Sequence, residues 1–149
     1  IKKLRINIPI QLDIYTQTWE GEYCKNLTKL TDKDKRFKIF LNLKREYIFT
    51  KFVDYDLLVI PSLWLETGPL VALEALASRI PVAGTNQGGI KEILENIDKC
   101  YLVKPKIKSW VDLFNKLIIE KGSENEVKST PKHTFKDVAS SMMKNLYVN

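Results

Sequence analysis

The segment from Asp56 to Leu94 restricts the possible folds more than any other part of the chain. It contains two short apolar runs of strand length, Asp56 to Ile60 and Ile80 to Gly84, and a turn and a helix-forming stretch follow each of them. Strands that alternate with helices over short connections are typical of a parallel sheet with helices on both faces. We therefore predict an α/β fold built on a doubly wound parallel sheet.

The rest of the chain continues this alternation. The predicted strands span residues 12–16, 37–41, 56–60, 80–84 and 100–103, and the predicted helices span residues 20–30, 44–52, 70–78, 89–95, 108–120 and 135–147. Residues 121–132 are polar and contain Gly122 and Pro131, so we expect a linker there. At 149 residues we expect the whole chain, 1–149, to form one domain.

Composition excludes several classes of protein. With 44% hydrophobic and 28% charged residues, the chain is typical of a folded globular domain, and no apolar stretch is long enough to span a membrane. Two cysteines and one histidine disfavour a disulfide scaffold, a metal site and a His-dependent nucleophile. We expect a reducing, cytoplasmic setting.

The net charge of +6 suits an anionic partner. An anionic substrate and an anionic membrane surface both fit, and a Lys-rich solvated surface fits equally well. No nucleic-acid motif accompanies the charge, so we expect no nucleic-acid partner. Peripheral association with a membrane stays open.

The helix predicted at residues 70–78 carries the strongest chemical signal. Its residues are apolar on nearly all sides, and Glu74 is its only charge, a pattern typical of a helix packed inside a domain. Helical side chains lean toward the N-terminus, so Glu74 can reach a ligand at the helix start. Pro69 favours the first helical position. The free amides of Leu70 and Val71, together with the helix dipole, suit a phosphate group.

Glu66 lies on the loop eight residues before Glu74 and would overlook the same spot. Carboxylates accept hydrogen bonds from sugar hydroxyls, whereas diphosphate suits backbone amides. We therefore predict a ligand with an anionic centre between two hydroxyl-bearing ends. Most helical Glu side chains are simply solvated, and a buried structural acid paired with a Lys is a further alternative for Glu74.

These residues resemble the retaining glycosyltransferases of family 4, which have the GT-B fold. Glu66 and Glu74 form the E-x7-E pattern of that family, and the flanking pieces PS-x-W-x-E, LEALA-x-x-IPV and GGI-x-E match in order and spacing. The resemblance implies that Glu66 is the catalytic residue and contacts hydroxyls of the donor sugar, and that Glu74 holds the nucleotide ribose. It also implies that the amides after Glu66, from Thr67 and Gly68 to the helix start, face the donor diphosphate.

By this resemblance the chain is the donor-binding half of an enzyme of polysaccharide biosynthesis. Such an enzyme transfers a hexose from a nucleotide diphosphate sugar to a glycan or lipid-linked acceptor, in the cytoplasm or at the inner face of the membrane. No cofactor and no metal are expected, because the helix start and basic side chains would stabilise the departing diphosphate. A non-catalytic nucleotide-sugar-binding module and an interaction scaffold with the same fold remain alternatives.

The resemblance begins near Leu12, after the place of the first strand and helix of the family's donor half. We expect those elements, with their Arg and Lys, and the acceptor domain to lie upstream of Ile1, which is not an initiator Met. The isolated chain is then expected to be inactive. Residues 135–147 are similar to the closing crossover helix of the family, so we expect the natural C-terminus here.

Three further positions carry weaker expectations. Lys44 follows the strand at 37–41, where the crevice of a doubly wound sheet would place it near the nucleotide base. Residues 84–89, GTNQGG, fit either a close approach to a ligand or a simple turn. Arg79 stands where many family members have Gly at a helix exit, so we expect a different local exit geometry.

Overall fold

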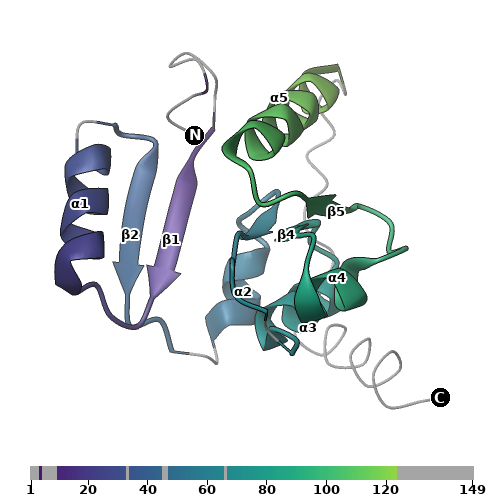
Figure 1. The fold of residues 1–149 in the computed structure, drawn as a ribbon, viewed down its shortest axis with the longest axis horizontal. Coiled ribbons are helices and arrows are strands. Elements are labelled where there is room, and N and C mark those ends of the chain that lie inside the picture. Colours follow the sequence, from purple (N-terminus) through teal and green to yellow (C-terminus); the bar gives the residue numbers. More distant parts are fainter. Residues whose placement is uncertain (1–3, 5–9, 33, 45–46, 66, 124–149) are drawn as a thin grey trace. The chain divides into compact units, whose positions relative to one another are not determined.

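The computed structural model describes residues 4, 10–32, 34–44, 47–65 and 67–123 (Figure 1). The chain divides into two compact units, Ile1–Ile48 and Phe49–Asn149. Strands and helices alternate along the described residues, and the recorded strand pairs are all parallel. The predicted α/β fold with parallel strands is therefore confirmed.

The first unit contains a two-stranded parallel sheet and the helix that connects its strands. β1 (Leu12–Thr16) pairs with β2 (Phe37–Leu41) along its whole length, and α1 (Gly21–Thr31) lies between them in sequence. Tyr15 lies opposite Phe40, and their rings stack with centroids 4.9 Å apart. Both predicted strands are correct to the residue, and the helix begins and ends one residue later than predicted, within the usual uncertainty of helix ends.

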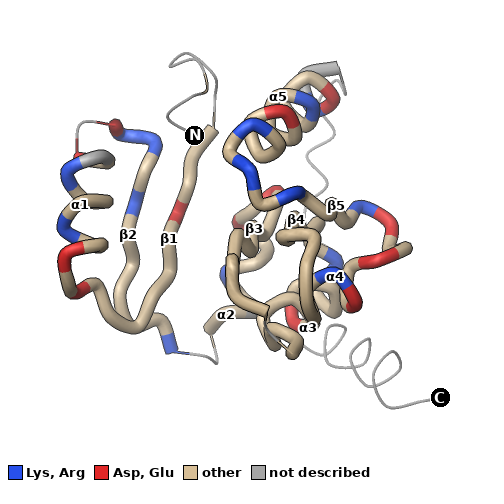
Figure 2. Tube along the Cα trace, in the orientation of Figure 1, with Lys and Arg blue, Asp and Glu red and all other residues tan. Residues whose placement is uncertain are grey.

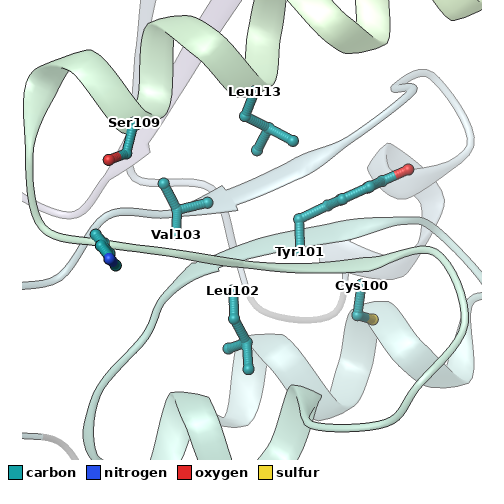
Figure 3. A pocket seen from close by; sticks show the side chains of 7 residues that line it. Cys100, Tyr101, Leu102, Val103, Ser109 and Leu113 are labelled. Carbon is teal, nitrogen blue, oxygen red and sulfur yellow. The ribbon is translucent and has the colours of Figure 1, made fainter.

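The second unit contains a three-stranded parallel sheet in the order β3-β4-β5. Its elements are α2 (Ile48–Phe52), β3 (Leu58–Ile60), α3 (Leu70–Ala77), β4 (Val82–Thr85), α4 (Gly88–Leu94), β5 (Cys100–Val103) and α5 (Ile107–Ser123). The first residue of α2, Ile48, is also the last residue of the first unit. α3 contacts β3 and β4, α4 contacts β4 and β5, and α5 contacts β5. Figure 3 shows that Tyr101 and Val103 of β5 point toward α5, whereas Leu102 points to the opposite side. Helices thus cover both faces of this sheet.

The core of the second unit lies where α4 packs on β4. Val82, Thr85, Ile90 and Leu94 are each less than 2% exposed. Gly84 permits this packing, because a Cβ built at Gly84 would lie 2.3 Å from Ile90 Cγ2 and 2.7 Å from Leu94 Cδ1. A glycine therefore sets how closely the helix approaches the strand.

α2 and α5 differ from the helices predicted for them. α5 continues to Ser123, three residues into the predicted linker, because its last turns contain good helix formers and a Lys116–Glu120 pair at i,i+4 spacing (3.6 Å). α2 begins at Ile48, four residues later than predicted. The remaining linker residues and the predicted helix 135–147 lie outside the described residues. No helix within the described ranges is both long and apolar enough to cross a membrane.

The exit of α3 contradicts the expectation at Arg79. Arg79 has a φ of 58°, in the left-handed region that glycine favours. Its amide donates to the carbonyl oxygen of Leu76 at 3.0 Å, and the amide of Ile80 donates to that of Ala75 at 3.1 Å. This pair of bonds is the Schellman motif, which satisfies the last helical carbonyls. The exit geometry is therefore the one that a glycine would adopt, and the prediction of a different geometry is wrong.

Replacing Arg79 with Gly is expected to raise the free energy of unfolding by up to about 1 kcal/mol. The left-handed conformation costs a residue with a Cβ about 1–2 kcal/mol, and the greater freedom of glycine in the unfolded chain offsets part of the gain. Urea denaturation measures the change. Arg79→Ala keeps the Cβ and is the control, so an equal gain in that variant would assign the effect to the lost guanidinium instead.

Candidate functional site

The candidate site lies at the carboxyl ends of β3 and β4, which are neighbours in the sheet. β3 ends at Ile60 and connects to α3 through residues 61–69, here called the β3–α3 loop. β4 ends at Thr85 and connects to α4 through Asn86 and Gln87. In open α/β sheets, ligands bind in the crevice outside the carboxyl ends of the strands.

The start of α3 presents backbone amides at this crevice. Pro69 has an extended backbone and is the N-cap of α3. It therefore precedes the first helical residue, whereas the sequence predicts that it occupies that position. The amide of Ala72 makes the first helical bond, to the carbonyl oxygen of Pro69 at 2.9 Å. The amides of Leu70 and Val71 precede that bond and have no acceptor in the helical pattern. Together with the helix dipole, they can bind an anion.

Glu74 lies on the buried side of α3 and is 5% exposed. The other buried residues of this helix are Ala72, Ala75 and Ala77, whereas Leu70 at the helix start is 56% exposed. The sequence predicts a helix enclosed on all sides, but α3 is buried on one side only. Its small residues allow that side to approach the sheet closely, and its larger residues lie on the other sides. A solvated Glu74 is excluded. Ligand contact and a structural acid remain as alternatives.

The β3–α3 loop is mostly exposed. Its three consecutive apolar residues 63–65 are between 72% and 82% exposed, with Trp64 the most exposed. Thr67 is exposed, and Gly68 is half-buried with a φ of 148°. Glu66 lies outside the described residues, so its role at the donor sugar stays a prediction.

Lys44 belongs to the first unit, where it is exposed just after β2. Since the residues around α3 belong to the second unit, a role for Lys44 beside a nucleotide base stays a prediction.

The GTNQGG segment, residues 84–89, contacts the β3–α3 loop and the end of β3. Thr85 Oγ1 donates to the carbonyl oxygen of Ile60, and Gln87 Nε2 donates to that of Ser62, both at 3.4 Å. A Cβ built on Gly89 would lie 2.5 Å from the carbonyl carbon of Thr67. The turn interpretation holds for Gly88, which has a φ of 54°. Gly89 instead packs on the loop, a contact that the sequence signals only through its paired glycines.

The β3–α3 loop and α3 themselves carry no basic side chain, since no Lys or Arg occurs between residues 56 and 78. Figure 2 shows that basic residues lie instead along the connection from β5 to α5 and on α5 itself. Lys104, Lys106 and Lys108 are all exposed there. Within residues 56–78, the groups that can attract an anion are therefore the amides and the helix dipole at the start of α3.

A hollow of about 400 Å³ lies elsewhere, between β5 and the start of α5 (Figure 3). It is lined by residues 100–104 with Ser109 and Leu113, and no residue predicted for the site takes part. Burial raises the pKa of the Cys100 thiol, which disfavours the reactive thiolate. In the described ranges, no three His, Cys, Asp or Glu side chains are grouped to hold a metal ion. The hollow thus offers no evident chemistry.

Comparison with known proteins identifies a family that the sequence matches. A sequence model of the family described as "Glycosyl transferases group 1" matches residues 1–133, which is most of the chain. The match includes both units up to the end of the described residues and the candidate site. A search of curated proteins finds no match to the chain.

Proposed function

The chain belongs to the group 1 glycosyltransferases, and we propose that it is the donor-binding part of a retaining enzyme with the GT-B fold. In this proposal the enzyme transfers a hexose from a nucleotide diphosphate sugar to a glycan or lipid-linked acceptor. The observation that carries the proposal is Glu74, a buried acid within the first two turns of α3, whose N-terminal amides open at the strand ends.

Each part of the donor has a proposed partner. The diphosphate faces the amides from Thr67 and Gly68 to Leu70 and Val71, where the positive end of the helix dipole offsets its charge. Glu74 accepts hydrogen bonds from the ribose hydroxyls, and Glu66 accepts them from the hexose. Lys44 is proposed to lie near the base.

The proposed reaction proceeds by positioning and charge stabilisation. The amides at the start of α3 stabilise the negative charge that develops on the departing diphosphate, and the two Glu side chains orient the sugar and the ribose. In this proposal the helix start and basic side chains together supply that stabilisation, without a metal ion. The acceptor is held by a facing domain, which also excludes water from the cleft.

The basic charge of the chain also fits a place at the inner face of a cytoplasmic membrane, where lipid-linked acceptors are found. The exposed Lys104, Lys106 and Lys108 suit anionic headgroups. We include this location in the proposal as the setting of the reaction.

A panel of UDP-, GDP- and ADP-glucose tests donor binding directly. A ligand at 100 times its dissociation constant adds roughly 2.7 kcal/mol to the stability of the folded state, which thermal unfolding detects as a shift of about 5 °C or more. One preferred nucleotide is expected. If no member of the panel, and no free nucleotide diphosphate, shifts the transition, donor binding is wrong.

A second candidate is a nucleotide-sugar-binding module without turnover. The absence of Lys and Arg between residues 56 and 78 favours it, because charge on a departing diphosphate usually needs basic side chains as well as amides. Donor binding without transfer by the complete protein, tested across glycan and lipid-linked acceptors, would support this alternative over the enzyme.

Replacing Glu66 with Ala is expected to weaken binding of the preferred nucleotide sugar by about 10-fold, because a charge-assisted hydrogen bond contributes roughly 1.5–3 kcal/mol. Binding of the matching nucleotide diphosphate should stay unchanged, since only the hexose hydroxyls would contact this side chain. Isothermal titration with the two ligands measures the difference. Equal losses for both would remove Glu66 from the sugar subsite.

A further inference from the structure

The start of α4 lies unusually close to the main chain of the β3–α3 loop. A Cβ built on Gly89 would lie 2.5 Å from the carbonyl carbon of Thr67, and 2.6 Å from both the carbonyl oxygen of Thr67 and the amide nitrogen of Gly68. These separations are far below van der Waals contact, and the opposing atoms belong to the backbone, which cannot rotate away as a side chain can. Any residue other than glycine would have to displace the loop or the helix.

Conformation alone does not explain the glycine at this position. Gly88, the preceding residue, has a φ of 54° and therefore occupies the left-handed region, whereas Gly89 does not. Gly89 is nevertheless buried. Glycine is needed at position 89 because it has no side chain, which lets the two backbones come into contact.

Further contacts from the same segment hold both ends of the loop. At its beginning, Gln87 Nε2 donates to the carbonyl oxygen of Ser62, and just before it Thr85 Oγ1 donates to that of Ile60, both at 3.4 Å. At its end, Ile93 lies next to Gly68, where a Cβ would approach Ile93 Cδ1 to 3.3 Å. The loop is therefore contacted near its beginning by Gln87 and near its end by Gly89 and Ile93.

We propose that Gly89 is a positioning residue, which fixes the Thr67–Gly68 segment so that its amides and those of Leu70 and Val71 face one bound diphosphate. Gly89 itself touches no ligand in this proposal. The inference rests on the proposed function for the identity of the ligand, but the support of the loop is a property of the protein alone. The two parts can therefore be tested separately.

Hydrogen–deuterium exchange tests the support without any ligand. Gly89→Ala should raise the exchange rate of the hydrogen-bonded amides at the two ends of the loop, those of Trp64 and Ala72, by about 10-fold. An opening free energy reduced by 1.4 kcal/mol changes the open population tenfold. Gly84→Ala is the matched control. It adds the same methyl group in β4, against the side chains of Ile90 and Leu94 and not against the loop. Exchange at Trp64 and Ala72 should therefore rise no more than exchange in the rest of the second unit.

Titration with UDP-, GDP- and ADP-glucose tests the consequence. At a temperature well below both unfolding transitions, Gly89→Ala should bind the nucleotide sugar preferred by the parent at least 10-fold more weakly, and Gly84→Ala within about 3-fold of the parent. If Gly89→Ala does not fold, Gln87→Ala removes one support without adding volume, and it should raise exchange in the first half of the loop.

The outcomes separate the two ideas. Parental exchange at Trp64 and Ala72 in Gly89→Ala overturns the support, whatever the protein binds. Raised exchange with unchanged donor affinity overturns the positioning role. A parent that binds no panel member overturns the proposed function, while the exchange result still decides whether Gly89 holds the loop.

Discussion

Replacing Glu74 with Gln is expected to weaken binding of the preferred nucleotide diphosphate by about 10-fold or more while leaving the fold intact. An amide presents one acceptor oxygen where a carboxylate presents two, so a ribose diol loses one of its hydrogen bonds. The side chain is 5% exposed, which leaves little water to replace the lost bond. Isothermal titration of the parent and the variant measures the change.

Glu92→Gln is the matched control, because it makes the same chemical change at an exposed position on α4. It should bind the nucleotide as the parent does. Parental affinity in Glu74→Gln would make the ribose role wrong. If Glu74→Gln instead unfolds at a much lower urea concentration than Glu92→Gln, the structural-acid alternative is supported.

Replacing Ile90 with Ala is expected to lower the free energy of unfolding of the second unit by about 2–5 kcal/mol. Ile90 is fully buried in the contact between α4 and β4, so its loss removes apolar contact area and leaves a cavity. Urea denaturation, followed by circular dichroism, measures the change. A loss below 1 kcal/mol would mean that α4 is not firmly packed on the sheet.

The same site allows a double-mutant cycle. Gly84→Ala should also destabilise the unit, by about 1–3 kcal/mol, because the added methyl group enters the space that Ile90 fills. Combined with Ile90→Ala, it should be less harmful than alone, since the cavity accepts the methyl group. Additive losses would contradict a direct contact between the two positions.

Apolar periodicity and turn residues predict where each strand lies, although β3 begins two residues later than predicted and β4 spans Val82–Thr85 and not residues 80–84. The strands at Leu12–Thr16, Phe37–Leu41 and Cys100–Val103 are as predicted, because each is bounded by polar or turn-forming residues. The end of α5 was misplaced because a polar composition is compatible with an exposed helix as well as with a linker. Arg79 was misjudged for a related reason, since two backbone hydrogen bonds outweigh the preference of one residue for another φ.

The division of the strands into two sheets was not predicted. Apolar periodicity identifies each strand by itself and carries no information on which strands pair. The recorded sheets are β1-β2 and β3-β4-β5.

For the candidate site, the sequence predicted the helix start and the position of Glu74 within it. It could not predict the contact of Gly89 with Thr67, because a meeting of two backbones involves no side-chain pattern that periodicity can detect. The order of strand pairing decides which loops become neighbours. β3 and β4 lie side by side in the sheet, and their two loops are therefore adjacent.

The exposure of Trp64 gives the protein an intrinsic optical probe. An indole in water emits at longer wavelength than one in apolar surroundings, and Trp64 is 82% exposed, whereas Trp19 and Trp110 are half-buried. The red edge of the emission band and its quenching by iodide therefore report chiefly on the β3–α3 loop. Any molecule that covers this loop, whether a sugar, a lipid or another protein domain, can be followed in real time without a label.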